Sequence, residues 1–197
     1  MVSGDSNAFG RYYAEILRNE GLNEFDAADL SDLDTPTLAA HDVVILGETP
    51  LSAAQAQMLS DWVDTGGNLI AMRPDPDLSG LLGLTSAGGT LANAYLQVDT
   101  SESPGTGIVG ETMQFHGTAD RYLATDAETI ATLFSDANTA TSNPALTLRS
   151  VGSNGGQAAA FTYDLARSVV YTRQGNPAWA GQERDGQSGP IRSDDLF

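Results

Sequence analysis

The sequence lacks two reactive side chains. It contains no cysteine, and its nine basic residues are all arginine, so lysine is absent as well. These absences exclude disulfide frameworks, thiolate zinc sites, and thiol or amine nucleophiles. No apolar run approaches the roughly 18 residues of a membrane-spanning helix, and no charged-then-apolar leader is present, so we expect no membrane insertion.

Positive charge is also scarce. The 197 residues include 26 acidic side chains, which gives a formal net charge of −17 and a sequence pI near 4.1. Such a surface repels phosphate backbones and anionic membranes, so we expect no nucleic-acid partner. The balance favours an extracellular or cell-surface protein, with the cytoplasm of a halophile as the alternative. The hydrophobic content of 41% is enough for a packed core.

The length fits a single domain, in which the composition changes after Leu84. Residues 1–84 alternate helical and strand patterns, whereas residues 85–197 are richer in Gly, Ser, Thr and Asn and have the turn signals of β structure. The chain begins almost directly with a helical pattern and ends without tail-like composition. We therefore expect that this chain is a piece of a larger protein and that it contacts the rest of that protein.

The clearest local pattern is a strand–helix–strand unit. Val43–Leu46 is a continuous, mostly β-branched run typical of a strand buried on both faces. Ser52 and Gln55 have the spacing of a capping box at the start of the next helix, and Gly66-Gly67 ends that helix. Leu69–Met72 then predicts a second strand, parallel to the first.

Weaker patterns flank this unit. Phe9 to Leu17 have helical spacing, with Ser6 or Asn7 as the expected cap, and Thr35-Pro36 predicts a short helix with Thr35 as its cap. Residues 1–8 predict no strand, and residues 22–28 predict a short one. Further strands are expected over residues 91–98, 112–115, 129–134, 145–151, 158–163 and 169–172.

The stretch DVVILGETPLSAAQAQMLSDWVDTGGNLIAMRP resembles the class I glutamine amidotransferase-like fold. It is most similar to the trehalose-utilisation-type domains and the middle domain of some β-galactosidases. The later stretch GGQAAAFTYDLARSVV is similar to a late strand and turn of those domains. The resemblance implies an α/β fold with a flavodoxin-like three-layer core, a largely parallel sheet and a β-rich C-terminal half.

The resemblance also identifies a missing nucleophile. True amidotransferases place a cysteine after the strand that corresponds to Leu69–Met72, where this sequence has Arg73-Pro74-Asp75. Arginine stays protonated and cannot act as a base. We therefore expect no glutaminase activity, and the sequence leans away from an enzyme. The leading hypothesis is a non-catalytic module with a binding or structural role.

Open α/β sheets bind ligands beyond the carboxyl ends of their strands. This rule selects Glu48, Arg73 and Asp75, together with Asp164 and the strand-end His116, as candidate ligand-binding residues. An arginine beside carboxylates is suited to a sugar hydroxyl or a carboxylate ligand, and equally to an ion pair that fastens loops. The alternative function is a carbohydrate-active or other hydrolytic domain that uses these groups. It requires the carboxylates and His116 to converge in one pocket.

No cofactor or metal is expected. Gly66-Gly67 follows a helix and Gly155-Gly156 joins two strands, whereas a phosphate loop needs a strand, glycines and then a helix. The Asp75-Pro76-Asp77 stretch lacks the spacing of a calcium loop and is expected to form a turn or helix cap. Neither His41 nor His116 belongs to a histidine metal motif.

Overall fold

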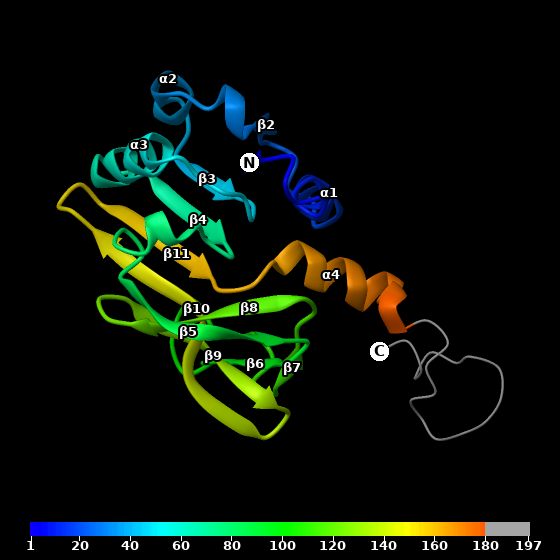
Figure 1. The fold of residues 1–197 in the computed structure, drawn as a ribbon. Coiled ribbons are helices and arrows are strands. Elements are labelled where there is room, and N and C mark those ends of the chain that lie inside the picture. Colours follow the sequence, from blue (N-terminus) through cyan, green and yellow to red (C-terminus); the bar gives the residue numbers. More distant parts are fainter. Residues whose placement is uncertain (180–197) are drawn as a thin grey trace.

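The computed structural model describes residues 1–179 and has a mixed α/β fold built on one nine-stranded sheet (Figure 1). In spatial order its strands are β2 (Ala28–Asp29), β1 (Val2–Ser3), β3 (Val43–Leu46), β4 (Asn68–Met72), β11 (Gly156–Phe161), β10 (Thr139–Val151), β9 (Glu128–Asp136), β6 (Tyr95–Val98) and β7 (Met113–Gln114). The first five strands are parallel to their neighbours, and the sheet becomes antiparallel from β11 onward.

A second sheet and four α-helices complete the described structure. The sheet pairs β5 (Leu84–Ala92) with β8 (Thr118–Ala124) in antiparallel fashion. The helices are α1 (Tyr12–Asn19), α2 (Thr35–Ala39), α3 (Ala53–Asp64) and α4 (Leu165–Gln174), with 3-10 turns at η1 (Leu30–Asp32), η2 (Pro76–Leu78) and η3 (Pro177–Trp179). Within residues 1–179 no helix has the length and apolar character needed to cross a bilayer.

The predicted strand–helix–strand unit is confirmed. Strands β3 and β4 are parallel, and Ser52 and Gln55 form both hydrogen bonds of the capping box at the start of α3. The two glycines after the helix have different roles. Gly66 has a φ of +116°, which a side chain would strain, whereas a Cβ on Gly67 would overlap the indole ring of Trp62. Trp62 therefore packs directly on the backbone that leads into β4.

The two faces of the parallel strands are covered by different helices. One face of these strands is buried in the main core together with side chains of α3. Its residues include Val44 of β3, Leu69 of β4 and Ala158 of β11. The opposite face, with Ile45 and Ile70, is partly buried against α1 and α4. Figure 1 shows α2 and α3 on one side of these strands and α1 and α4 on the other. This layering brings α1 and α4 to the carboxyl ends of the strands.

Three N-terminal predictions were wrong, and a fourth was correct at one residue only. Val2–Ser3 forms strand β1 between β2 and β3, but two residues are too few for any periodic signal. Helix α1 begins at Tyr12 with no side-chain cap, because the Asn7 side chain instead accepts from the N–H of Phe9. The cap of α2 is Asp34 and not Thr35. Of the short strand expected over residues 22–28, only Ala28 lies in β2.

The C-terminal half is β-rich as expected, with several changes of element. The strand expected over residues 91–98 is interrupted at Asn93, which has a φ of +49°, and is divided between β5 and β6. Only two residues of the strand expected over 112–115 are present, as β7. Residues 169–172 lie in α4 and not in a strand, because Asp164 caps a helix that starts just before them. Strand β8 had no prediction at all.

Candidate functional site

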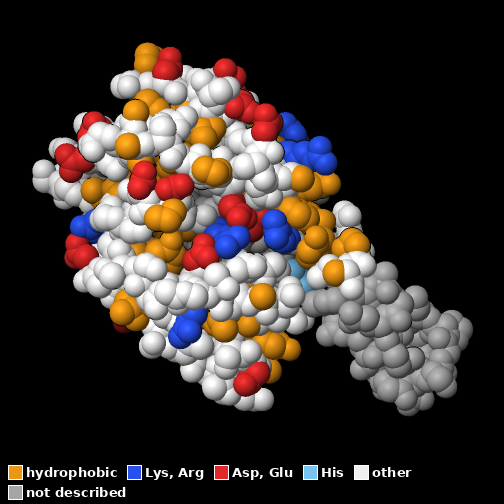
Figure 2. Space-filling model, in the orientation of Figure 1, with side chains coloured by type: hydrophobic (Ala, Val, Ile, Leu, Met, Phe, Trp, Pro, Cys, Tyr) orange, Lys and Arg blue, Asp and Glu red, His pale blue; other side chains and the backbone are white. Residues whose placement is uncertain are grey.

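The carboxyl ends of β3 and β4 meet the start of β8 in a cluster of charged side chains. Glu48 follows β3 by two residues, Arg73 follows β4 directly, and Asp120 lies in β8. The guanidinium of Arg73 donates through Nη1 to Glu48 Oε1 at 2.8 Å. It also donates to both carboxylate oxygens of Asp120, through Nε at 2.9 Å and Nη2 at 3.1 Å. Arginine and acidic side chains gather near the middle of the face in Figure 2.

Arg73 is held tightly on both its main chain and its side chain. Its φ of +40° lies in the left-handed region that non-glycine residues rarely adopt, which costs on the order of 1 kcal/mol or more. Its N–H donates to Phe161 O at 2.7 Å, which extends the β4–β11 ladder by one residue. Burial lowers the pKa of Arg73, but the hydrogen bonds and charges of Asp120 and Glu48 outweigh burial and raise that pKa overall.

Asp164 lies beneath this cluster as a buried structural carboxylate. It accepts from the Tyr13 hydroxyl at 2.7 Å and from the Asn7 amide at 2.9 Å, and it also caps α4 by accepting from backbone N–H groups. Burial and the negative charge of Asp164 raise the pKa of Tyr13, so its hydroxyl stays a donor. Asn7 also lies 3.4 Å from Glu48 Oε2. Asp164 thereby positions the Asn7 side chain, which contacts Glu48.

A pocket of about 290 Å³ opens at this cluster, and we call it the rim pocket. Its charged lining comes from Glu48, Arg73, Asp75 and Asp120. Its other lining residues are Ser6, Asn7, Thr49 and the prolines Pro50, Pro74 and Pro76. The side chains of Glu48, Arg73 and Asp120 retain 25%, 24% and 31% exposure, so a ligand can reach them. The pocket thus joins charged groups to rigid apolar walls.

Asp75 lines the rim pocket and also fastens its loop. One carboxylate oxygen accepts from the N–H of Leu51 at 3.1 Å, and the other accepts from the N–H of Asp77 at 2.9 Å to cap η2. The expected turn-and-cap role of this stretch is therefore present. Among residues 1–179 no group of three or more potential ligands could hold a metal ion.

His116 lies in a different pocket. Its side chain is buried, with 3% exposure, and lines a cavity of about 470 Å³ together with residues of α4 and β7. Its main chain exchanges hydrogen bonds with the Ser168 hydroxyl, and its ring meets the Tyr171 ring edge-on. The structure therefore brings Glu48, Arg73 and Asp75 together, places Asp164 beneath them, and separates His116 from them.

Two residues of the site were not predicted as site residues. Asp120 was missed because strand β8 was missed, and its approach to Arg73 depends on how the second sheet packs. Asn7 was expected to cap a helix, yet its amide joins Asp164 to Glu48. Both residues are remote in sequence from the groups they contact, so no local pattern identifies them.

No protein-family model matches the chain, and no curated protein matches it. Its fold is nevertheless similar to parts of solved glycosidases. An exo-β-1,4-mannosidase from Opitutaceae bacterium strain TAV5 aligns over 88% of this chain with 17% identity and a TM-score of 0.62. A β-galactosidase from Bacillus circulans sp. alkalophilus aligns over 74% with 15% identity and a TM-score of 0.57.

The chain spans only 32% of that mannosidase and 23% of that β-galactosidase. A cytoplasmic protein from Salmonella typhimurium LT2 is similar over 83% of this chain and 86% of its own length, with 12% identity and a TM-score of 0.62. At these identities the likeness extends to the fold alone. The same fold therefore occurs both within larger glycosidases and as most of a smaller protein.

Proposed function

We propose that this domain binds carbohydrate at the rim pocket, as a non-catalytic part of a protein that acts on glycans. The observation that supports it most is the fixed geometry of Arg73 between Glu48 and Asp120 at an accessible pocket. Groups held in place by their neighbours bind a ligand without a further loss of side-chain entropy.

The rim pocket has chemistry suited to sugar hydroxyls. A hydroxyl both donates and accepts, so it can donate to a carboxylate of Glu48 or Asp75 while it accepts from the guanidinium of Arg73. The pyrrolidine rings of Pro50, Pro74 and Pro76 add apolar walls for the C–H faces of a sugar ring. The volume of about 290 Å³ suits one sugar residue at the end of a chain rather than a long oligosaccharide.

The glycosidase neighbours support the same ligand class, since two of them are named for mannosides and galactosides. Function is carried by sites rather than folds, so this support is an analogy that the pocket must justify. Kinship with the amidotransferase-like fold and its flavodoxin-like core is part of the proposal. It would explain why Arg73 occupies the elbow after β4, where a nucleophile would otherwise lie.

Hydrolysis is the second candidate function. It is favoured by the presence of three carboxylates, Glu48, Asp75 and Asp120, in one pocket of a glycosidase-like fold. Paired carboxylates are the usual groups of glycoside cleavage. Against it, Glu48 and Asp120 accept from Arg73, and Asp75 accepts from two backbone N–H groups. Release of nitrophenol from nitrophenyl β-mannoside or β-galactoside would establish hydrolysis.

The direct test is calorimetric titration of the full chain with β-1,4-mannobiose and with lactose. We expect saturable binding of at least one sugar, weakened about tenfold or more by Glu48→Gln and by Arg73→Met, because each removes a charged hydrogen-bonding group. The matched control is Arg173→Met, since Arg173 forms an exposed pair with Glu20 outside the pocket. Thermal unfolding confirms that each variant is folded. Absence of binding, or equal binding by all variants, contradicts the proposal.

The setting of the domain is also proposed and not yet tested. Coverage of only part of each glycosidase supports a domain that works within a larger chain. The net charge of −17 supports an extracellular or halophilic setting. Fractionation of cells that express the natural protein would distinguish an extracellular location from a cytoplasmic one.

A further inference from the structure

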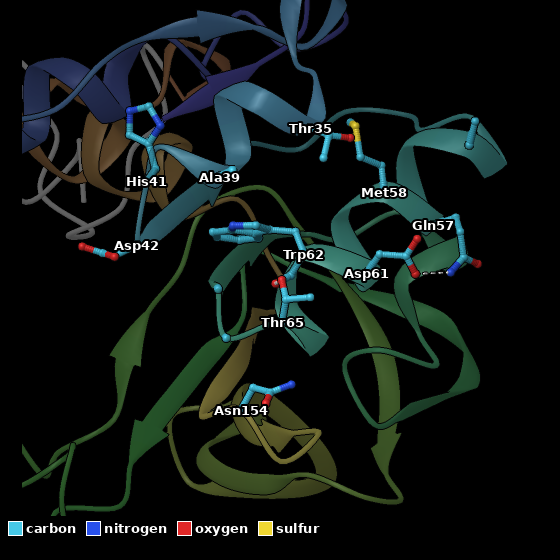
Figure 3. Close-up of a pocket in the computed structure, with 13 residues that line it drawn as sticks. Thr35, Ala39, His41, Asp42, Gln57, Met58, Asp61, Trp62, Thr65 and Asn154 are labelled. Carbon is cyan, nitrogen blue, oxygen red and sulfur yellow. Dashed lines mark hydrogen bonds between the residues drawn. The ribbon is translucent and has the colours of Figure 1, made fainter.

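A larger pocket lies at the opposite ends of the same strands. It has a volume of about 830 Å³ and lies between the end of α2, helix α3 and the turn that contains Asn154 (Figure 3). Because Asp42 and Gly67 directly precede β3 and β4, this pocket adjoins the amino ends of those strands. We call it the basal pocket. It shares no lining residue with the rim pocket.

Trp62 is the central side chain of the basal pocket. Its ring lies on the backbone of Gly67, and Figure 3 shows it between Ala39 on one side and Thr65 on the other. The side chain is nine-tenths buried, with 9% exposure. Within residues 1–179 its indole N–H donates to no protein group, and it is not among the buried unpaired side-chain atoms, so it is accessible from the pocket. A hydrogen-bond donor that a ligand can reach therefore lines this pocket.

The basal pocket also presents acceptors. Asp42 uses its main-chain carbonyl to accept from Asn68, and its carboxylate has no hydrogen-bond partner in the described part of the chain. The Asp61 carboxylate accepts from the Gln57 amide at 2.7 Å and keeps further lone pairs. No arginine lines the pocket. His41 lines it, but its ring is paired with Asp26, so anionic ligands are disfavoured there.

We propose that the basal pocket is a second carbohydrate-binding site, which takes neutral oligosaccharides. A sugar hydroxyl can accept from the Trp62 indole N–H, and its neighbours can donate to the carboxylates of Asp42 and Asp61. Met58 and Ala39 supply apolar contacts for ring C–H groups. The volume, larger than that of the rim pocket, has room for more than one sugar residue.

A cationic ligand matches this lining less well. The two carboxylates would attract an amine, but the free group on Trp62 is a donor and needs an acceptor, which an ammonium does not offer. A hydroxyl satisfies both kinds of group at once. The inference shares its ligand class with the proposed function and depends on none of the rim residues.

The test uses the indole N–H signals of the full chain in nitrogen-15 NMR. The sequence has two tryptophans, Trp62 and Trp179, so Trp179→Phe assigns the Trp62 signal. We expect β-1,4-mannotriose or lactose to shift that signal saturably. Asp42→Ala should weaken this binding about tenfold, because a hydrogen bond to a charged group is lost. The control Asp32→Ala, an exposed carboxylate outside the pocket, should leave it unchanged.

The two proposals fail in different ways. If either sugar binds with sensitivity to Glu48→Gln but leaves the Trp62 signal in place, the basal site is refuted and the rim site stands. If the Trp62 signal responds while rim variants bind normally, the basal site stands alone. A response to putrescine but to neither sugar would also overturn the inference, since it would identify an amine site.

Discussion

The two pockets at opposite ends of the parallel strands differ in how their polar groups are satisfied. In the rim pocket, Arg73 is paired with Glu48 and Asp120, and the Asp75 carboxylate accepts from two backbone N–H groups. In the basal pocket, the indole N–H of Trp62 and the carboxylate of Asp42 have no partner within residues 1–179. One site is organised in advance by its own contacts, whereas the other offers free groups.

This difference has an energetic meaning. Removing a group from the rim leaves its partners unsatisfied in a partly buried setting, so the cost appears in the stability of the fold. Removing the Asp42 carboxylate from the basal pocket breaks no internal hydrogen bond, so its cost should appear in ligand binding alone. In the ligand-free protein, we therefore expect the destabilising substitutions to be those of rim residues and of residues that pack around either pocket.

The largest effect is expected from Asp164→Ala, which removes the support of the rim. The change leaves Tyr13, Asn7 and the first N–H groups of α4 without their acceptor in a buried position. We expect a loss of about 3 kcal/mol in the free energy of unfolding, measured by urea denaturation. Asp34→Ala, at the exposed cap of α2, should cost clearly less. Equal losses would contradict the proposed support.

Gly67→Ala tests the basal side of the comparison. The new Cβ would overlap the Trp62 ring, so the ring must move away from β4. We expect a loss of about 2 kcal/mol from overpacking, together with a changed Trp62 indole signal. Gly80→Ala is the matched control, because a Cβ there meets no atom within 4 Å. A stable Gly67→Ala variant with an unchanged indole signal would show that the ring does not rest on this glycine.

Arg73→Met distinguishes the contribution of the ion pairs at the rim from that of side-chain packing. The variant keeps an apolar stem but leaves Glu48 and Asp120 facing each other without a cation. A loss of about 2 kcal/mol is expected in urea denaturation. The exposed pair of Arg173 and Glu20 gives the contrast, since Arg173→Met should change stability by no more than about 0.5 kcal/mol. Similar losses in both variants would remove the distinction between the rim and an ordinary surface pair.

The smallest effect concerns pH and His41, at the edge of the basal pocket. Its hydrogen bonds with Thr37 O and with Asp26 raise its pKa above the ordinary value of 6.5. Protonated His41 therefore favours the folded state. Its contribution is complete below the unfolded pKa and is lost as pH rises through the folded pKa.

Between roughly pH 5.5 and pH 8.5, the natural chain should lose slightly more stability than His41→Gln, by well under 1 kcal/mol. Paired urea titrations at the two pH values measure this difference. An equal change in both proteins, or a larger loss in the variant, would contradict the assigned direction of the pKa shift.

The sequence predicted those parts of the fold whose signals are local. The apolar run at Val43–Leu46 and the capping box at Ser52 and Gln55 each determine one element by themselves. Residues 169–172 have the β-branched composition of a strand, yet Asp164 caps a helix there and ties it to α1. Tertiary contacts override propensity in such a segment.

The candidate site was only partly visible in the sequence, for the same physical reason. Glu48, Arg73 and Asp75 follow strands that the sequence predicted, so the rule for carboxyl ends located them. Asp120 reaches Arg73 through the packing of a second sheet, and Trp62 reaches the basal pocket by packing on the backbone of Gly67. No local pattern encodes such contacts.

The most direct measurement is a crystal structure of the full chain soaked with β-1,4-mannobiose or lactose. The account predicts a sugar residue in the rim pocket, with hydroxyls within hydrogen-bond distance of Glu48 and Arg73. A sugar bound elsewhere, or an empty rim pocket at concentrations that saturate binding in solution, would contradict it.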